Sequence, residues 1–257
     1  MSSAYNPSII EIDNVSFKYF KDRELINNLT FSAGNGEFIG LLGANGSGKS
    51  TILKLAGGIL KPSGGYIKLW GKPLGAYGNK DRAKLLCYLP QLLDINVPFK
   101  VRELVGMGLY PYDIPPQMTV DEAIDAVGLN EKSESYVTNL SGGERRRVFI
   151  AMTLLQGAGL LLLDEPLANL DIKFQVELLK LLKELRSRKN ISIIMALHDI
   201  NIALKFEKVM LIKEGRILGI GSPGSVLTKA MLKEAFDVNI EIKKSDTGTY
   251  ISYENNF

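Results

Sequence analysis

The chain holds a single cysteine, Cys87, and a single histidine, His198, among its 257 residues. One thiol excludes an internal disulfide and any metal site built from several cysteines, and this composition is compatible with a reducing compartment. The net charge is only +3, from 31 Lys and Arg against 28 Asp and Glu, so no field of one sign points to a polyanionic partner. We therefore expect no nucleic acid among its partners.

Long hydrophobic runs are also missing. No apolar run approaches the ~18 residues that a membrane helix needs. The densest runs, 160–163 and 191–197, are both short. The first seven residues lack the basic start and the apolar stretch of a signal peptide. These features predict a soluble, intracellular protein that another chain would have to hold at a membrane.

The most specific motif is a glycine-rich stretch with the pattern G-x-x-x-x-G-K-S. It lies between an apolar run at 37–42, which suits a buried strand, and a helical pattern at 50–56. In a strand–loop–helix, backbone N–H groups and the helix N-terminus surround phosphate oxygens. We predict that Lys49 binds the β- and γ-phosphates of a nucleotide and that Ser50 ligates Mg²⁺. The predicted binding residues are Gly43, Ala44, Asn45, Gly46, Ser47, Gly48, Lys49, Ser50 and Thr51.

A second candidate element is the four-leucine run at 160–163, which ends at Asp164 and Glu165. Such a run fits a parallel strand buried on both faces, and open α/β sheets bind ligands where such strands end. Asp164 is predicted to hold Mg²⁺ and Glu165 to take a proton from water. His198 follows the apolar run 191–197 and is expected on the same rim, although a lone histidine is usually structural.

Three further candidates carry weaker signals. Gln91 follows a short strand and could reach a metal ion or a water, but its spacing alone favours a solvated loop amide. Tyr19 could stack on an adenine ring or be an ordinary strand aromatic. Ser141, Gly142 and Gly143, which we call the signature residues, open a helix and offer either a cluster of free N–H donors or a plain N-cap.

Hydrophobic periodicity predicts the rest of the architecture. Alternating strands at the start, a helical region over about 95–158 and buried strands after it predict an α/β fold. In the predicted fold, the central sheet is mostly parallel and an antiparallel β part precedes it. A helical lobe is inserted into the α/β body, and a hairpin at 240–257 ends the chain. We assign residues 1–257 to one domain. Three arginines, 145–147, spread over about half of the helix circumference. This spread favours structural or solvated contacts over a basic stripe that binds nucleic acid.

The order of these motifs resembles that of ABC-transporter ATP-binding subunits, over nearly the whole chain. The motifs are the phosphate loop, Gln91, 140–144, Asp164 with Glu165, Leu170 with Asp171, and His198. The resemblance implies a P-loop NTPase fold, ATP and Mg²⁺ as cofactors, and ATP hydrolysis. Ala44 stands where the family often has proline, and Glu144 is a common variant of glutamine; neither departure threatens activity.

The resemblance also implies a role for each candidate. At one nucleotide, Tyr19 stacks on adenine, Glu165 polarises the attacking water and His198 contacts the γ-phosphate. Gln91 senses the metal and couples the lobe to the body. Asp164 is the acid that holds the metal.

The resemblance also implies contacts between separate chains. The signature residues close on the ATP of a second copy in a homodimer, and Asp171 links the two sites. A segment at 96–112 resembles ATPase subunits that import ferric siderophores, haem or vitamin B12. This implies a membrane permease as partner, a solute-binding protein acting indirectly, and a peripheral location on the cytoplasmic face of the membrane.

Rival interpretations share many of these motifs. A soluble ABC ATPase of iron–sulfur cluster assembly has the same size and motifs and needs no permease. A DNA-repair or translation ATPase usually carries a long coiled-coil insertion or two cassettes, and this chain has neither. A non-enzymatic cassette is disfavoured because Glu165 and His198 are both present.

Overall fold

The computed structural model describes most of the chain. The described ranges are 8–19, 24–91, 97–114, 116–245 and 248–253. Parts of the predicted features lie outside the described residues, namely 1–7, the start of the helical region at 95–96, the hairpin turn 246–247 and the end 254–257. Among the described helices, none combines the length and the apolar character that crossing a membrane requires.

Within the described residues, the larger sheet has six strands in the order β10-β9-β3-β8-β7-β6. All its neighbours pair in parallel except the edge strand β10, which is antiparallel to β9. Because parallel strands end at one edge, β3, β6, β7 and β8 deliver the residues that follow them to a common rim. The strands are β3 (Phe38–Leu42), β6 (Leu86–Leu89), β7 (Leu160–Asp164), β8 (Ser192–Leu197), β9 (Lys208–Lys213) and β10 (Arg216–Gly221).

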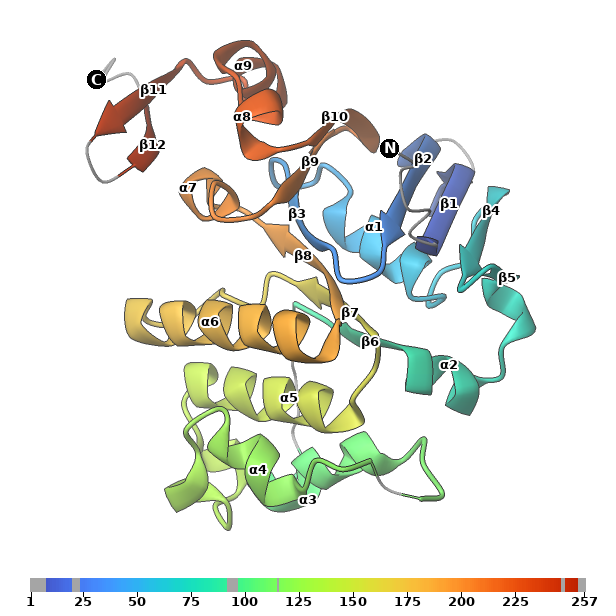
Figure 1. The fold of residues 1–257 in the computed structure, drawn as a ribbon, viewed down its shortest axis with the longest axis vertical. Coiled ribbons are helices and arrows are strands. Elements are labelled where there is room, and N and C mark those ends of the chain that lie inside the picture. The colour runs from blue at the N-terminus through green and yellow to red at the C-terminus, as the bar shows by residue number, and fades with distance from the viewer. Residues whose placement is uncertain (1–7, 20–23, 92–96, 115, 246–247, 254–257) are drawn as a thin grey trace, which may run out of the picture.

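A smaller antiparallel sheet covers part of this layer, with the strand order β2-β1-β4-β5 in the described residues. The alternating segments near the N-terminus form β1 and β2, as their two-residue period predicts, and β4 and β5 complete the sheet. Figure 1 shows it in blue and teal at one side of the larger sheet. The strands are β1 (Ser8–Phe17), β2 (Ile26–Gly34), β4 (Gly64–Leu69) and β5 (Lys72–Pro73).

The leucines of β7 show how the larger sheet buries both faces. Leu160 and Leu162 pack on the side of the smaller sheet and the helix after β3, whereas Leu161 and Leu163 pack with the later helices. All five residues of β7 are buried. The helices are α1 (Lys49–Ala56), α2 (Asn79–Leu85), α3 (Val101–Gly106), α4 (Val120–Asp125), α5 (Gly142–Gln156), α6 (Ile172–Lys189), α7 (Ile200–Ala203), α8 (Pro223–Val226) and α9 (Lys229–Phe236).

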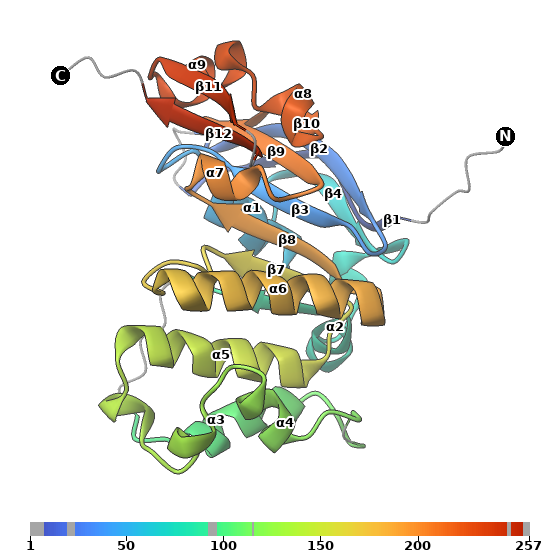
Figure 2. The same ribbon diagram turned by 60° about the vertical axis from the view of Figure 1, so that its left-hand side comes forward.

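Three helices of the predicted helical region, α3, α4 and α5, lie together at one end of the molecule, and α5 runs beside α6 (Figures 1 and 2). One cluster of buried side chains extends from β7 and β8 through α5 to α3 and α4. The assignment of the whole chain to one domain, with 95–158 as a lobe, stays a prediction.

The end of the described chain forms the predicted hairpin. β11 (Ile240–Ser245) pairs antiparallel with β12 (Gly248–Tyr253). Asn201 of α7 holds the hairpin to the body, because its amide accepts from the Ile251 backbone N–H at 2.7 Å and donates to the Ile251 carbonyl at 3.1 Å. The predicted fold class, an α/β P-loop fold with a mostly parallel sheet, is confirmed.

Candidate active site

The loop between β3 and α1 is shaped by glycines that other residues could not replace without strain. Gly46 and Gly48 have φ values of 78° and 104°, in the left-handed region that favours glycine. A Cβ at Gly43 would collide with the carbonyl oxygen of Ile212 on β9. The backbone therefore passes close to the neighbouring strand and leads directly into the N-terminus of α1. A phosphate cradle has this loop-to-helix arrangement.

Lys49 begins α1, and its ammonium turns back over the loop. Its Nζ donates to the carbonyl oxygens of Gly43, at 2.7 Å, and Ala44, at 3.1 Å. A lysine has three N–H donors, so one remains for a phosphate oxygen. Burial lowers the pKa of Lys49, and the nearby carboxylates of Glu165 and Asp164 raise it in opposition.

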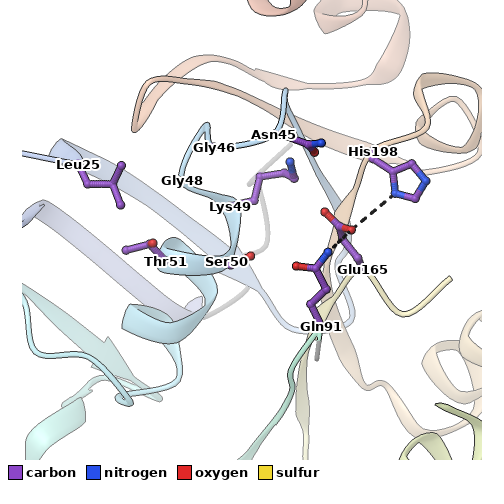
Figure 3. A pocket seen from close by; sticks show the side chains of 10 residues that line it. All are labelled: Leu25, Asn45, Gly46, Gly48, Lys49, Ser50, Thr51, Gln91, Glu165 and His198. Atoms are coloured by element: carbon purple, nitrogen blue, oxygen red, sulfur yellow. Dashed lines mark hydrogen bonds and ion pairs between the residues drawn. The ribbon is translucent and has the colours of Figure 1, made fainter. Parts of the chain in front are cut away.

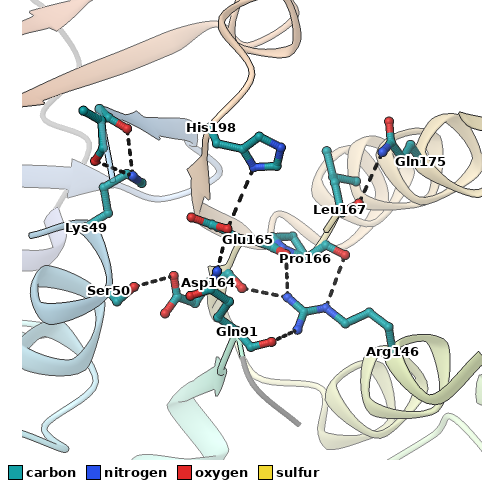
Figure 4. Close-up of polar contacts among 12 residues, drawn as sticks. Lys49, Ser50, Gln91, Arg146, Asp164, Glu165, Pro166, Leu167, Gln175 and His198 are labelled. Carbon is teal, nitrogen blue, oxygen red and sulfur yellow. Dashed lines mark hydrogen bonds and ion pairs between the residues drawn. The ribbon is translucent and has the colours of Figure 1, made fainter. Parts of the chain in front are cut away.

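Asp164 ends β7 directly beside the start of α1. Ser50 Oγ donates to Asp164 Oδ1 at 3.0 Å (Figure 4). The Tyr88 hydroxyl donates to Asp164 Oδ2 at 3.2 Å. Burial raises the pKa of Asp164, while these two hydrogen bonds favour the ionised carboxylate. The pKa of Tyr88 is raised, chiefly by burial and then by Asp164, so the phenol stays a donor.

Glu165, the next residue, has a φ of 47°, unusual for a side chain with a Cβ. This backbone turns its carboxylate away from β7 and toward two other side chains. Gln91 Nε2 donates to Glu165 Oε2 at 2.8 Å, and His198 Nδ1 lies 3.8 Å from the same oxygen. Gln91 follows β6 and His198 follows β8, so the ends of three neighbouring strands bring these groups together.

These side chains open into one cleft of about 580 Å³ (Figure 3). The phosphate loop forms one wall, and Gln91, Glu165 and His198 stand opposite Lys49. The lining residues are Leu25, Asn45, Gly46, Gly48, Lys49, Ser50, Thr51, Gln91, Glu165 and His198. A carboxylate on a left-handed backbone that faces a buried lysine across a cleft is typical of a functional site.

Comparison with known proteins decides the family. Residues 26–168 match the ABC transporter family. The chain belongs to this family.

Two curated relatives come from Bacillus subtilis. The chain is 33% identical to a petrobactin import ATP-binding protein, over 95% of this chain and 100% of the relative. It is 37% identical to an iron(3+)-hydroxamate import ATP-binding protein, over 87% and 86% of the two chains. Among solved structures, a chain of an inward-facing metal-chelate type ABC transporter superposes with a TM-score of 0.78 at 25% identity, covering 96% of both chains.

The signature residues of this ABC cassette do not line the cleft described above. Ser141 caps α5, with its hydroxyl accepting from the Glu144 backbone N–H at 3.3 Å while Glu144 accepts from the Ser141 N–H at 2.9 Å. Lys132 also contacts Glu144. The hydrogen bonds from Lys132 and from Ser141 lower the pKa of Glu144 to about 2. Ser141 is thus the N-cap of α5. Its contact with the ATP of a second copy stays a prediction.

Asp171 and Tyr19 also lie outside the lining, as do Asp164 and three residues of the loop, Gly43, Ala44 and Ser47. Asp171 caps α6, accepting from the Phe174 backbone N–H at 3.0 Å. Tyr19 is about half exposed, and its hydroxyl lies 3.4 Å from Thr51 Oγ1 at the base of α1. This position beside α1 is compatible both with stacking on an adenine ring and with an ordinary aromatic side chain.

Sequence reasoning missed Tyr88, Leu25 and the part that Arg146 plays. Tyr88 places a hydroxyl group in the apolar strand β6, which pairs with β7. A hydroxyl group in such a strand could have suggested a hydrogen bond to a buried side chain. Leu25 carries no such signal. The three arginines of α5 all donate to backbone carbonyl groups, which agrees with the structural contacts expected of them.

Proposed function

We propose that this chain is the ATP-hydrolysing subunit of an ABC importer that takes up a metal chelate through a separate permease. The observation that carries the proposal is the convergence of Lys49, Ser50, Glu165 and His198 on one cleft, with Asp164 hydrogen-bonded to Ser50 behind it. The curated relatives of the chain are import ATP-binding proteins. Family membership and this geometry together favour ATP over other phosphate ligands.

ATP binding would rest on the glycine loop, with Lys49 and the α1 N-terminus facing the phosphates. Mg²⁺ fits the donor set, because Ser50 and Asp164 offer two hard oxygen atoms held 3.0 Å apart. No group of three His, Cys, Asp or Glu side chains in the described residues could hold a metal alone, and Mg²⁺ commonly takes its other ligands from phosphate and water. When bound, this ion would neutralise charge that develops on the phosphates.

Hydrolysis needs a group that orients the water and accepts its proton. Glu165 is that group in this proposal, since its carboxylate points into the cleft opposite Lys49. Gln91 donates to this carboxylate, and His198 lies 3.8 Å from it. The His198 side chain is more than half exposed, so it is free to contact the γ-phosphate. The backbone N–H groups and Lys49 stabilise the charge of the transferred phosphoryl group.

The signature residues suggest that two copies act together. Gly142 and Ser141 are exposed, and the signature residues lie outside the cleft of their own chain. The chain therefore carries a cluster of helix N-terminal donors that its own nucleotide cannot use. A head-to-tail homodimer would place this cluster over the ATP of the partner, with Asp171 nearby to link the two sites.

The import role rests on the relatives. A petrobactin and an iron(3+)-hydroxamate import ATP-binding protein match nearly this whole chain, so a ferric siderophore is the favoured cargo, ahead of haem and cobalamin. A permease would hold the protein at the cytoplasmic face of the membrane and receive the motion of the helical region; a solute-binding protein would contribute indirectly. Co-purification of a polytopic membrane protein supports this assignment over the iron–sulfur alternative.

The test of the catalytic assignment is Glu165→Gln. We expect turnover to fall by roughly 10²- to 10⁴-fold, because the amide cannot accept the proton from water. ATP binding should persist, and the variant should form an ATP-dependent dimer that is measurable by light scattering. A variant that hydrolyses ATP at the wild-type rate would reject Glu165 as the base, and absence of ATP binding by the wild type would reject the function itself.

A further inference from the structure

Arg146 is a buried cation that the mechanism above does not use. It lies in the second turn of α5, and only 4% of its surface is exposed. Its side chain points from α5 to the rim where β6 and β7 end (Figure 4). Burial lowers the pKa of Arg146, and the nearby carboxylates of Asp164 and Glu165 oppose that shift.

The guanidinium group meets five backbone carbonyl oxygens. Nη1 donates to Pro90 at 3.0 Å and to Gln91 at 2.6 Å. Nη2 donates to Asp164 at 2.7 Å and to Glu165 at 2.6 Å, and Nε donates to Pro166 at 3.4 Å. An arginine has five N–H donors in a fixed planar fork, so every donor has a carbonyl acceptor.

These acceptors belong to two segments, one around Gln91 and one around Glu165. The side chains of these two residues are hydrogen-bonded to each other. Three consecutive carbonyl groups, from Asp164 to Pro166, fix the peptide planes on both sides of the Glu165 Cα, where φ is 47°. The Gln91 carbonyl fixes the backbone whose side chain donates to Glu165 at 2.8 Å. One rigid group therefore sets the backbone orientation of both partners in this hydrogen bond.

We propose that Arg146 is a positioning residue for ATP hydrolysis, which holds Glu165 and Gln91 in place and ties them to α5. The inference rests on the proposed function, because it assigns Glu165 as the base. It adds a connection between two regions, since the N-cap and the first turn of α5 carry the signature residues Ser141, Gly142 and Gly143. A shift of α5 is transmitted through Arg146 to the carboxylate that faces the water.

The same helix supplies a matched control. Arg147 also donates to two backbone carbonyl oxygens, those of Val127 at 3.0 Å and Gly128 at 3.2 Å. Both acceptors belong to the turn after α4, away from the cleft lining. Arg147→Gln therefore removes a guanidinium–carbonyl contact from α5 without touching the ends of β6 and β7.

The experiment compares Arg146→Gln, Arg146→Lys and Arg147→Gln with the wild-type chain in ATP turnover, ATP binding and thermal unfolding. We expect kcat of Arg146→Gln to fall roughly 10- to 100-fold, the scale set by misplacing a catalytic group by about 1 Å. KM for ATP should change less than about threefold, because Lys49 and the loop are untouched. Arg146→Lys should recover part of kcat, since its single ammonium reaches fewer carbonyl groups, and Arg147→Gln should keep the wild-type kcat.

The outcomes separate the two proposals. A wild-type protein without ATP turnover contradicts the proposed function. A wild-type protein that turns over ATP, with Arg146→Gln and Arg147→Gln equal in kcat, overturns the positioning role. Loss of ATP binding together with kcat, or failure of both Arg146 variants to fold, shows that Arg146 holds the fold rather than the site and overturns the inference as well.

Discussion

At the scale of single residues, the site depends on hydrogen bonds that fix carboxylates. Asp164 is buried, and burial alone would favour its neutral form. The hydroxyl groups of Ser50 and Tyr88 each donate to one of its oxygens and oppose this effect. Tyr88 thus supports the negative charge that Asp164 needs for the Mg²⁺ binding that we propose.

Tyr88→Phe is the corresponding test. Removal of the phenol raises the pKa of Asp164 further, so the acidic limb of the activity profile should move to higher pH. The Mg²⁺ concentration for half-maximal turnover should rise roughly threefold to tenfold, the equivalent of one net hydrogen bond. The measurement is a Mg²⁺ titration of turnover at several pH values.

Tyr77→Phe serves as the control, since the Tyr77 hydroxyl donates to the Leu69 carbonyl oxygen at 2.7 Å, away from the cleft lining. It should change neither the Mg²⁺ dependence nor the pH profile. Equal behaviour of the two variants would mean that Tyr88 does not tune Asp164.

At the scale of elements, the start of α5 combines a helix cap with the signature residues. Ser141 and Glu144 form a reciprocal capping box, and Thr119 and Glu122 form the same box at the start of α4. Each box satisfies N–H groups that the first helical turn leaves without partners. The two caps are matched in chemistry, but only one precedes the glycines that we place over a partner's nucleotide.

Ser141→Ala and Thr119→Ala should therefore agree in stability and differ in activity. Each should cost about 1 kcal/mol of unfolding free energy through the lost cap, measured by denaturant unfolding. Only Ser141→Ala should lower ATP turnover. Equal turnover in the two variants would reduce Ser141 to a helix cap and remove it from the proposed nucleotide contacts.

At the scale of the whole molecule, the signature residues lie outside the cleft that the phosphate loop lines. This separation is the reason that we propose a dimer. Gly142 is informative here because an added Cβ would meet no described atom of its own chain within 4 Å. Substitution at this position should leave the folded chain intact. Any loss of turnover would then come from contact with a second copy.

Gly142→Val and Lys49→Ala should each abolish turnover when assayed alone. A mixture of the two proteins should regain turnover, because a mixed dimer pairs the intact loop of the first with the intact signature residues of the second. The measurement is ATP turnover of each variant and of the mixture at equal total concentration. A mixture as inactive as its components would place both elements in the same chain's site.

Local patterns in the sequence were enough to predict several elements. The glycine spacing predicted a loop with φ values that favour glycine, and the four leucines predicted a strand buried on both faces, as β7 is. α2 was not predicted, because none of its residues is buried and it therefore shows no apolar period. Secondary structure is predictable where burial leaves a periodic trace in the chain.

The sequence by itself determined which residues could bind phosphate, because loop geometry and helix start follow from neighbours in the chain. Only the tertiary structure decided that Tyr88 contacts Asp164 and that Arg146 meets the carbonyl groups of Gln91 and Glu165. Those contacts join segments far apart in sequence, and the order of strands β6, β7 and β8 in the sheet brings them together. Sheet order depends on how whole elements pack, so no local pattern could reveal it.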